Sequence, residues 1–367
     1  MKRLLVTIDS LRYDYLKHMP RTESYLDTTH DRAFSACTAT MGSFPATIGG
    51  EYPDGTGLHP GSSLANHMDR PAVGITTNHL LSAEYGYDEG FDRFHSPKGG
   101  GESLKDKGAI FLTQGTLPYK AAVWGWNQYQ QLQSRFGSVP KSFRRAEAVV
   151  EEFRTHVEDE DDWFGWLHLM EPHHPYDPDD SPVSRAEAQA VSRRVVGGGG
   201  TEAEKELTRE LYRREVEELD EKLAPLWEFV PDDARVVFCA DHGELLGEDD
   251  LWGHPGVMRE ELLNVPFGTR NAPDLGDVVS LVDVPTVLRG EEHGQGTLDR
   301  DVAFATYGDE KAAVNADHIV NSEGTRTLWS DESAEDPSLE REYERFEPGR
   351  VDLDDALMED LEDLGYA

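Results

Sequence analysis

Two apolar stretches that each end on an aspartate decide the fold: Leu4-Leu5-Val6-Thr7-Ile8-Asp9 and Val236-Val237-Phe238-Cys239-Ala240-Asp241. Short, uninterrupted apolar runs predict strands that are buried on both faces, as in a parallel sheet covered by helices. Because ligands bind beyond the carboxyl ends of such strands, we expect Asp9 and Asp241 to lie together at one edge of the sheet. With the adjacent His242 they offer two carboxylates and one imidazole, which is a ligand set for a divalent cation.

A simpler interpretation is that each aspartate only caps the helix that follows it. Capping explains either acid alone. It does not explain the string Asp241-His242-Gly243-Glu244, which is followed closely by a second histidine segment, Trp252-Gly253-His254. We therefore expect a metal site rather than two helix caps.

Further apolar runs alternate with helical patterns along the chain. The runs cover residues 72–76 and 163–170, and the helical patterns cover residues 144–156 and 202–229. Alternation of this kind predicts βαβ units. The expected fold class is α/β, with a mostly parallel central sheet that carries helices on both faces.

After residue 267 the apolar segments of the sequence become shorter and more polar. We predict a catalytic α/β domain over residues 1–267 and a small α+β subdomain over residues 268–367. In the subdomain we expect short strands near residues 303–306 and 318–320 and a terminal amphipathic helix over 351–366. Residues 99–120 show little periodicity and are expected to form an excursion over the edge of the sheet.

The amino-acid composition limits which partners the protein can bind and in which cellular environment it works. The 367 residues include 72 acidic and 35 basic side chains, which gives a formal net charge of −37. This excess disfavours binding to nucleic acid and to anionic membranes, and it favours a halophilic protein whose self-repulsion is screened by concentrated salt. The two cysteines, Cys37 and Cys239, imply no disulfide framework. Because no apolar run is long enough for a signal peptide or a membrane span, we expect a cytoplasmic protein.

Four segments carry the residues with ligating or catalytic chemistry. They are Thr7-Ile8-Asp9-Ser10-Leu11-Arg12, the stretch TMGSFPATIGG at 40–50, Glu171-Pro172-His173-His174-Pro175-Tyr176, and Asp241-His242-Gly243-Glu244 with Gly253-His254 and Val265-Pro266. In this order and spacing they resemble the sulfatase family of the alkaline-phosphatase superfamily over nearly the whole chain, in a haloarchaeal-type form with threonine at the nucleophile position. The resemblance implies the α/β fold above and a reaction at an anionic ester.

The resemblance implies that Thr40 is the nucleophile, at the point where this chain departs from the family pattern. Sulfatases carry Cys-x-Pro-x-Arg, whose cysteine is oxidised to formylglycine. Here Thr40 stands ten positions before Gly50, and Phe44 occupies the place of the arginine. Cys37 is a rival, but it lacks the arginine and lies three residues too early, so we expect it to pack in the core.

A metal and a helix would both assist a threonine nucleophile. A threonine hydroxyl is a weak nucleophile and needs help to react as an alkoxide, which a bound metal supplies. We expect Met41-Gly42-Ser43 to open a helix whose amides and dipole favour an anionic ester. A role for Thr40 as the N-cap residue of that helix is compatible with this assignment.

The resemblance also implies the remaining members of the site. The metal ligands are Asp9, Thr40, Asp241 and His242, and they would hold one divalent ion, with calcium, manganese, magnesium and zinc all open. His173 and His254 match family residues that bind the oxygens of the ester or protonate the leaving group.

Other polar residues have weaker claims to a role. We expect a structural ion pair for Arg12 and an ordinary position, on the surface or satisfied in the core, for His79 and His174. Asn78, at the end of another strand, is a candidate hydrogen-bond donor to a metal ligand. One metal is expected, although the pair of His173 and His174 leaves a second one open.

The leading hypothesis is a metal-dependent hydrolase of small phosphate, phosphonate or sulfate esters that forms a covalent intermediate on Thr40. Phosphoryl chemistry is favoured, because a formylglycine hydrate releases sulfate by collapse and a threonine sulfate ester has no such exit. One alternative is a transferase that moves a phospho-alcohol group onto a glycan or a lipid headgroup. A second alternative is an inactive module that binds an anionic sugar. The intact set of metal ligands and histidines argues against this alternative.

Overall fold

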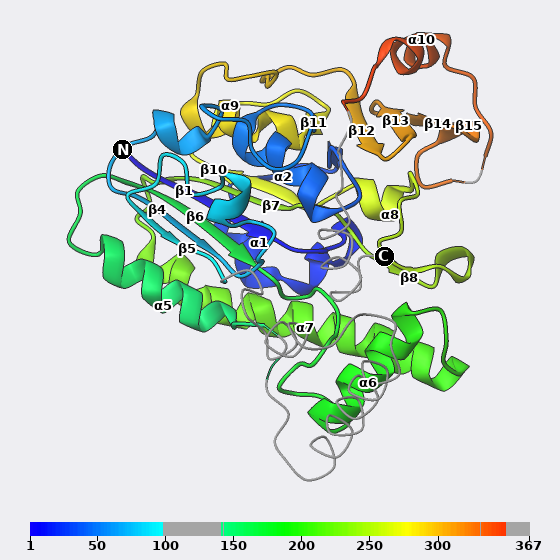
Figure 1. The fold of residues 1–367 in the computed structure, drawn as a ribbon, viewed down its shortest axis with the longest axis horizontal. Coiled ribbons are helices and arrows are strands. Elements are labelled where there is room, and N and C mark those ends of the chain that lie inside the picture. The colour runs from blue at the N-terminus through cyan, green and yellow to red at the C-terminus, as the bar shows by residue number, and fades with distance from the viewer. Residues whose placement is uncertain (98–140, 142, 331, 350–367) are drawn as a thin grey trace, which may run out of the picture.

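The computed structural model describes residues 1–97, 141, 143–330 and 332–349, and a seven-stranded sheet forms its centre (Figure 1). The strands of this sheet are β1 (Lys2–Ile8), β2 (Thr28–Thr29), β4 (Ala72–Thr76), β5 (Arg93–His95), β6 (Trp163–Leu169), β7 (Arg235–Ala240) and β10 (Phe267–Arg270). Their order is β2-β10-β7-β1-β6-β4-β5. All neighbours from β7 to β5 are parallel, and β10 runs antiparallel to both strands beside it. The predicted fold class is confirmed.

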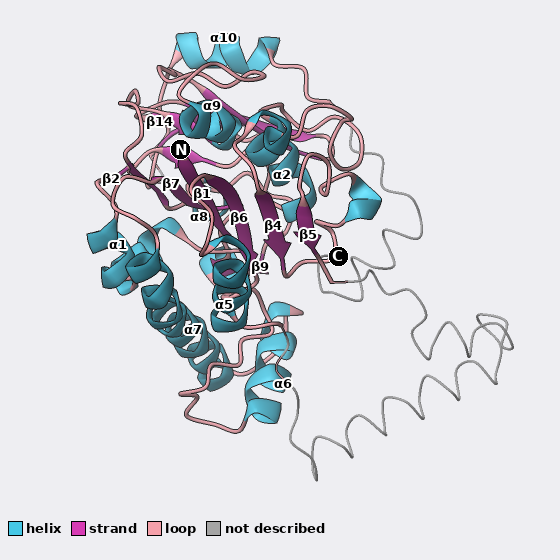
Figure 2. Cartoon of the chain, turned by 90° about the vertical axis from the view of Figure 1, so that its left-hand side faces the viewer, coloured by secondary structure: helices cyan, strands magenta, loops and turns pink. Residues whose placement is uncertain are grey.

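Helices cover both faces of the sheet (Figure 2). One side carries α1 (Pro20–Tyr25), α5 (Ala146–Val157) and α7 (Glu202–Phe229), and the other carries α2 (Thr40–Gly49) and α9 (Val284–Arg289). Covering both faces explains why β1, β6 and β7 are apolar along nearly their whole length, as the sequence indicated. The long helix α7 starts at a capping box between Thr201 and Glu204, directly after the glycine run at 197–200.

Further elements of the described ranges are two small strand pairs and two helices outside the central sheet. They are β3 (Ala33–Phe34), which pairs with β11 (Val279–Ser280), β8 (Leu245–Leu246), which pairs with β9 (Trp252–Gly253), and the helices α6 (Arg185–Val196) and α8 (Glu260–Leu263). No helix in the described ranges has the length and apolar content needed to cross a bilayer.

A second, antiparallel sheet of four strands follows in the chain. Its strands are β12 (Ala303–Tyr307), β13 (Glu310–Val314), β14 (His318–Asn321) and β15 (Gly324–Thr327), and α10 (Pro337–Arg345) packs on it. The short strands expected near 303–306 and 318–320 are therefore present as β12 and β14. The central sheet continues through β10 to Arg270, and α9 contacts β1 and β7. The division at residue 267 stays a prediction, and the excursion at 99–120 and the helix at 351–366 lie outside the described residues.

Candidate active site

Asp9 and Asp241 lie next to each other at the carboxyl edge of the central sheet. The register pairs Ile8 with Ala240, the last residue of β7. The amide of Asp9 donates to the carbonyl oxygen of Leu169 (2.9 Å), and the amide of Asp241 donates to that of Ile8 (3.1 Å). Both aspartates thus extend the ladder by one step, and both side chains emerge where the sheet ends. This is the juxtaposition that the two apolar runs predicted.

The group formed by Asp9, Asp241 and His242 has the geometry of a cation site. One ligand atom from each residue lies within 4.8 Å of the others, and all three residues are fully buried. The Nδ1–H of His242 donates to the carbonyl oxygen of Gly243 (2.8 Å), so the lone pair on Nε2 faces the carboxylates of Asp9 (3.9 Å) and Asp241 (3.6 Å). This is the ring orientation of a metal-ligating histidine.

The electrostatics of the two carboxylates also fit a divalent cation. Oδ1 of Asp241 accepts hydrogen bonds from the amides of Ser10 (3.1 Å) and His242 (2.8 Å), whereas its buried Oδ2 has no hydrogen-bond partner. Burial and the nearby charge of Asp9 raise the pKa of Asp241 well above its usual value. Burial also raises the pKa of Asp9, but His173 and His168 outweigh this effect and hold the pKa low. A cation between the two acids would relieve the repulsion that disfavours their joint ionisation.

Thr40 lies at the first position of α2 and faces this group. Its Oγ1 is 3.4 Å from Oδ2 of Asp9 and 3.4 Å from Nε2 of His242. The N-cap residue is Ala39, which has no side chain that could cap the amino end of the helix. The amino terminus of α2 is therefore oriented to attract an anion beside the Thr40 hydroxyl. Thr40 is the first helical residue rather than the N-cap residue.

Ser35 anchors the segment that leads to Thr40. Its hydroxyl contacts the carbonyl oxygens of Cys37 and Asp241 and the hydroxyl of Ser43. These contacts join the start of α2 to the end of β7, although the two are far apart in the sequence. The position of Thr40 relative to the carboxylates is therefore fixed by buried hydrogen bonds.

Cys37 packs beneath the helix and is not placed as a nucleophile. The residue is 4% exposed, and its Sγ lies so close to Gly42 that a Cβ at position 42 would collide with it. Burial raises the pKa of the thiol to about 12, so the thiolate is disfavoured near neutral pH. Both features agree with the expected packing role.

Two polar residues from neighbouring strands contact Asp9. Nδ2 of Asn78, just after β4, donates to Oδ2 of Asp9 (3.0 Å). Nε2 of His168, in β6, lies 3.3 Å from the same oxygen, and its Nδ1 lies 3.1 Å from Oγ1 of Thr7. Asn78 was a candidate for this contact, whereas His168 was not among the predicted site residues. The signal for His168 was its place as the one ionisable residue in the apolar run of β6.

The predicted ester-binding histidines lie together with His174 beside the carboxylate group. His173 and His174 follow β6 and His254 follows β9, and the ring centroids of His242 and His254 are 4.7 Å apart. Nδ1 of His254 is 3.2 Å from Oε2 of Glu244, which is fully buried. Burial, followed by the neighbouring histidines, lowers the pKa values of His174 and His254 well below the usual value. His174 had only a weak claim to a role, and the turn after β6 brings its ring to the same edge of the sheet as that of His173.

The other residues with weaker claims to a role are Arg12 and His79. Arg12 forms a two-point ion pair with Asp14 (2.8 and 3.0 Å) and a further one with Glu248 (2.6 Å). It also donates to the carbonyl oxygen of Glu244 (3.2 Å). Arg12 therefore has the structural role that was expected, and it braces the loop that follows Asp241. His79 belongs to neither of the two groups of possible metal ligands found among the described residues.

One buried arginine ties down both ends of the loop at 171–177, which carries the adjacent histidines. Nη2 of Arg145 donates to Oδ1 of Asp177 (3.1 Å), and Nη1 donates to Oε2 of Glu215 in α7 (3.1 Å) and lies 3.7 Å from Oε1 of Glu171. The amide of Asp177 also donates to Glu215 (2.7 Å). Burial raises the pKa of Glu215 to about 7. Three carboxyl groups thus share one guanidinium, which fixes where the loop enters and leaves the site.

Replacing Arg145 by methionine is expected to lower the free energy of unfolding by about 3–5 kcal/mol, because buried carboxyl groups lose their counter-ion. Chemical denaturation in concentrated salt measures the change. The matched control is Arg144→Met, since the neighbouring Arg144 pairs with Glu152 at the partly exposed surface. That substitution should lower the free energy of unfolding by less than about 1 kcal/mol. Equal losses in the two variants would contradict the role of the Arg145 network.

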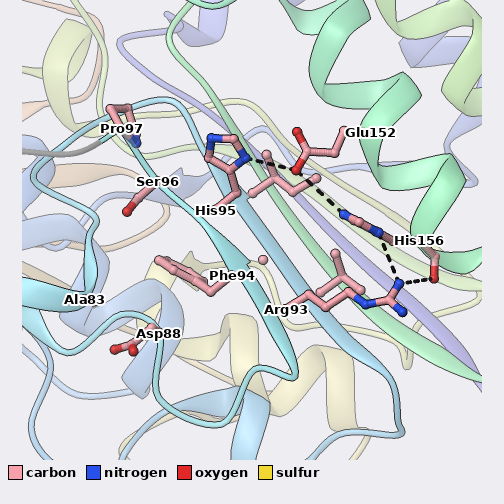
Figure 3. Close-up of a pocket in the computed structure, with 12 residues that line it drawn as sticks. Ala83, Asp88, Arg93, Phe94, His95, Ser96, Pro97, Glu152 and His156 are labelled. Atoms are coloured by element: carbon pink, nitrogen blue, oxygen red, sulfur yellow. Dashed lines mark hydrogen bonds and ion pairs between the residues drawn. The ribbon is translucent and has the colours of Figure 1, made fainter.

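A separate cavity lies at the β5 edge of the sheet (Figure 3). It has a volume of about 530 Å³ and is lined in part by Arg93, His95, Glu152 and His156. In Figure 3 the carboxylate of Glu152 lies between the two imidazoles, 3.0 Å from His95 and 3.7 Å from His156. None of the predicted site residues lines this cavity. The site at the carboxyl edge and this cavity are therefore different places.

The sequence also matches proteins of known class. The low-salt glycan biosynthesis sulfotransferase Agl7 of Haloferax volcanii is 36% identical over 96 residues, which are 23% of this chain and 24% of that protein. The match therefore spans about a quarter of the length of that curated relative.

Two solved structures share the fold at low sequence identity. The phosphonate monoester hydrolase of Agrobacterium radiobacter aligns with a TM-score of 0.58 and 15% identity over 89% of this chain and 88% of its own. The lipoteichoic acid synthase LtaP from Listeria monocytogenes aligns with a TM-score of 0.60 and 13% identity over 94% and 88%. The family model described as Sulfatase matches residues 3–268, which is most of the chain. The chain therefore belongs to the sulfatase family.

Proposed function

We propose that this protein is a metal-dependent enzyme that cleaves an anionic phosphate, phosphonate or sulfate ester through a covalent intermediate on Thr40. The observation that carries the proposal is the position of Thr40 Oγ1, which lies 3.4 Å from both Asp9 and His242 at the amino end of α2. Near that position lie a hydroxyl group, two carboxylates, an imidazole and the amino terminus of a helix.

The donor set fits one divalent cation held by Asp9, Thr40, Asp241 and His242. Its oxygen-rich character, with one imidazole, suits calcium, manganese, magnesium or zinc. Bound there, such a cation would lower the pKa of the Thr40 hydroxyl and offset negative charge on the ester.

The residues of the chain have complementary roles in the proposed step. The Thr40 hydroxyl releases its proton to water, its oxygen attacks the phosphorus or sulfur atom, and the bond from that atom to the alcohol oxygen breaks. The alcohol leaves with a proton from His173 or His254, and the remaining imidazole donates to a nonbridging oxygen. The amino terminus of α2 stabilises the charge on the transferred group.

The fate of the Thr40 ester separates hydrolysis from transfer. Hydrolysis frees the threonine when water attacks the phosphorus or sulfur atom, and transfer frees it when the hydroxyl of a sugar or lipid headgroup does. We place hydrolysis of phosphorus esters first. Transfer is the second candidate, because threonine lacks the carbonyl hydrate through which formylglycine releases its group. The names of Agl7, a sulfotransferase, and of LtaP, a synthase, agree with that second candidate.

The test is an ester panel assayed in concentrated salt. Purified protein loaded with each divalent cation is offered 4-nitrophenyl phosphate diesters, phosphonates and sulfate, with and without an added sugar or glycerol acceptor. Turnover of phosphorus esters without an acceptor supports the hydrolase, and turnover that requires the acceptor supports the transferase. Failure on every ester, with metal bound, would favour the binding module.

A further inference from the structure

Helix α6 packs against both segments that carry the site histidines, the loop after β6 and the segment that begins with β9. Nε2 of Gln189 donates to Oδ2 of Asp177 at the end of that loop (2.6 Å). Further along the helix, Val196 lies against Gly253 in β9, where a Cβ added to the glycine would be 3.1 Å from Cγ1 of the valine. The helix therefore borders the site on the side of its imidazoles.

Arg193 lies between these two contacts on the same side of α6. It follows Gln189 by four positions and precedes Val196 by three, and residues at these spacings share one face of a helix. Its side chain is exposed, and Nη1 donates to Oε1 of Gln189 (3.4 Å). The charge of Arg193 also reaches His174, whose pKa it helps to lower after burial and the neighbouring imidazoles. The guanidinium therefore lies at the border of the site.

Arg193 differs from the other arginines of α6 because no acidic side chain pairs with it. Arg185 pairs with Asp179 (3.1 Å), and Arg194 pairs with Glu204. Within the part of the chain that the structure describes, no carboxylate forms an ion pair with Arg193, although acidic side chains outnumber basic ones by 72 to 35 in the sequence. Arginine binds a carboxylate or a phosphate through two parallel hydrogen bonds, so this guanidinium is available to an anionic ligand.

We propose that Arg193 binds a second anionic group, such as a carboxylate, on the alcohol part of the substrate. The preferred ester then carries two anionic groups, of which only one is cleaved. The inference rests on the proposed function, in which the cleaved group lies at Thr40 and the alcohol part lies toward His173 and His254. Because α6 borders the site on the side of these imidazoles, its free guanidinium faces the alcohol part. Arg193 is a specificity-determining residue and takes no part in bond cleavage.

The test uses phosphonic acids, which contain no ester bond, so that binding is measured without turnover. Calorimetry on the Mn²⁺-loaded full-length protein, at one fixed salt concentration, compares 3-phosphonopropionate with propylphosphonate and 6-phosphonohexanoate with hexylphosphonate. For at least one chain length, the wild type should bind the carboxylate compound about tenfold or more tightly than its partner, as expected for hydrogen bonds between charged groups. Arg193→Gln should lose this preference and keep its affinity for the alkylphosphonate. Arg194→Gln is the matched control, because its neighbouring arginine already pairs with Glu204, and it should keep the preference.

Arg193→Lys keeps the positive charge without the planar fork and should retain only part of the preference, and circular dichroism checks the fold of each variant. The inference is overturned if the wild type binds both members of each pair equally, or binds neither, or if folded Arg193→Gln keeps the preference. Equal binding by a wild type that cleaves esters of the panel would leave the proposed function standing. A preference that requires Arg193, in a protein that cleaves no ester, would overturn the proposed reaction and leave the anion site standing.

Discussion

Thr40→Ala is expected to lower kcat/KM for the best ester of the panel by at least about 10³-fold, because it removes the atom that attacks the substrate. The substitution should leave the fold intact, since the backbone of α2 is held by Ser35 and Ser43 rather than by the Thr40 side chain. Steady-state kinetics in concentrated salt measure the loss. Mass spectrometry of the peptide that spans residues 37–40 measures the covalent adduct, which should be absent in the variant.

Two controls separate the hydroxyl nucleophile from the neighbouring thiol. Thr40→Ser keeps a hydroxyl group at the same place and should retain measurable turnover. Cys37→Ala should stay within about tenfold of the wild type, because Cys37 packs against Gly42 and a small buried change mainly affects stability. A formylglycine mass shift at Cys37, with activity that disappears in Cys37→Ala, would transfer the nucleophile to position 37 and end the assignment of Thr40.

The strand ends were predictable because their signal is local. An apolar run that stops at an acid can be read within a few residues, and the parallel pairing of β1 with β7 then brings Asp9 to Asp241. The place of Thr40 followed from the family resemblance, since nothing within its own segment indicates which strand ends it faces. Ser35 makes that connection by contacting Asp241, a residue 206 positions away.

The contacts that sequence reasoning missed depend on pairing between distant segments. His168 reaches Asp9 only because the register sets Thr7 beside His168 across β1 and β6. An isolated histidine in an apolar strand gives no hint of that register. The closeness of His174 to His254 could not be predicted for a related reason, because His254 lies 80 positions later and no spacing rule connects a loop after β6 with a segment after β9.

Asp241→Asn is expected to abolish binding of the activating cation and to lower kcat/KM by at least about 10³-fold, since one of two charged ligands is lost. Asparagine keeps an Oδ1 that can accept from the amides of Ser10 and His242, so the loop should fold as before. The substitution changes only Oδ2, which has no hydrogen-bond partner. An amide NH2 group takes its place next to Asp9. The metal-free variant should therefore be more stable than the metal-free wild type, because two buried carboxylates no longer repel each other.

The measurement is the midpoint of thermal unfolding with and without the cation that activates the wild type. Ligand binding to the folded state stabilises it by about 2.7 kcal/mol at one hundred times the dissociation constant, so the cation should raise the midpoint of the wild type and not that of Asp241→Asn. Asp233→Asn removes an exposed acid and has the same change in net charge, so it should respond to the cation as the wild type does. An equal cation response in Asp241→Asn and Asp233→Asn would show that the paired strand-end aspartates do not hold the metal.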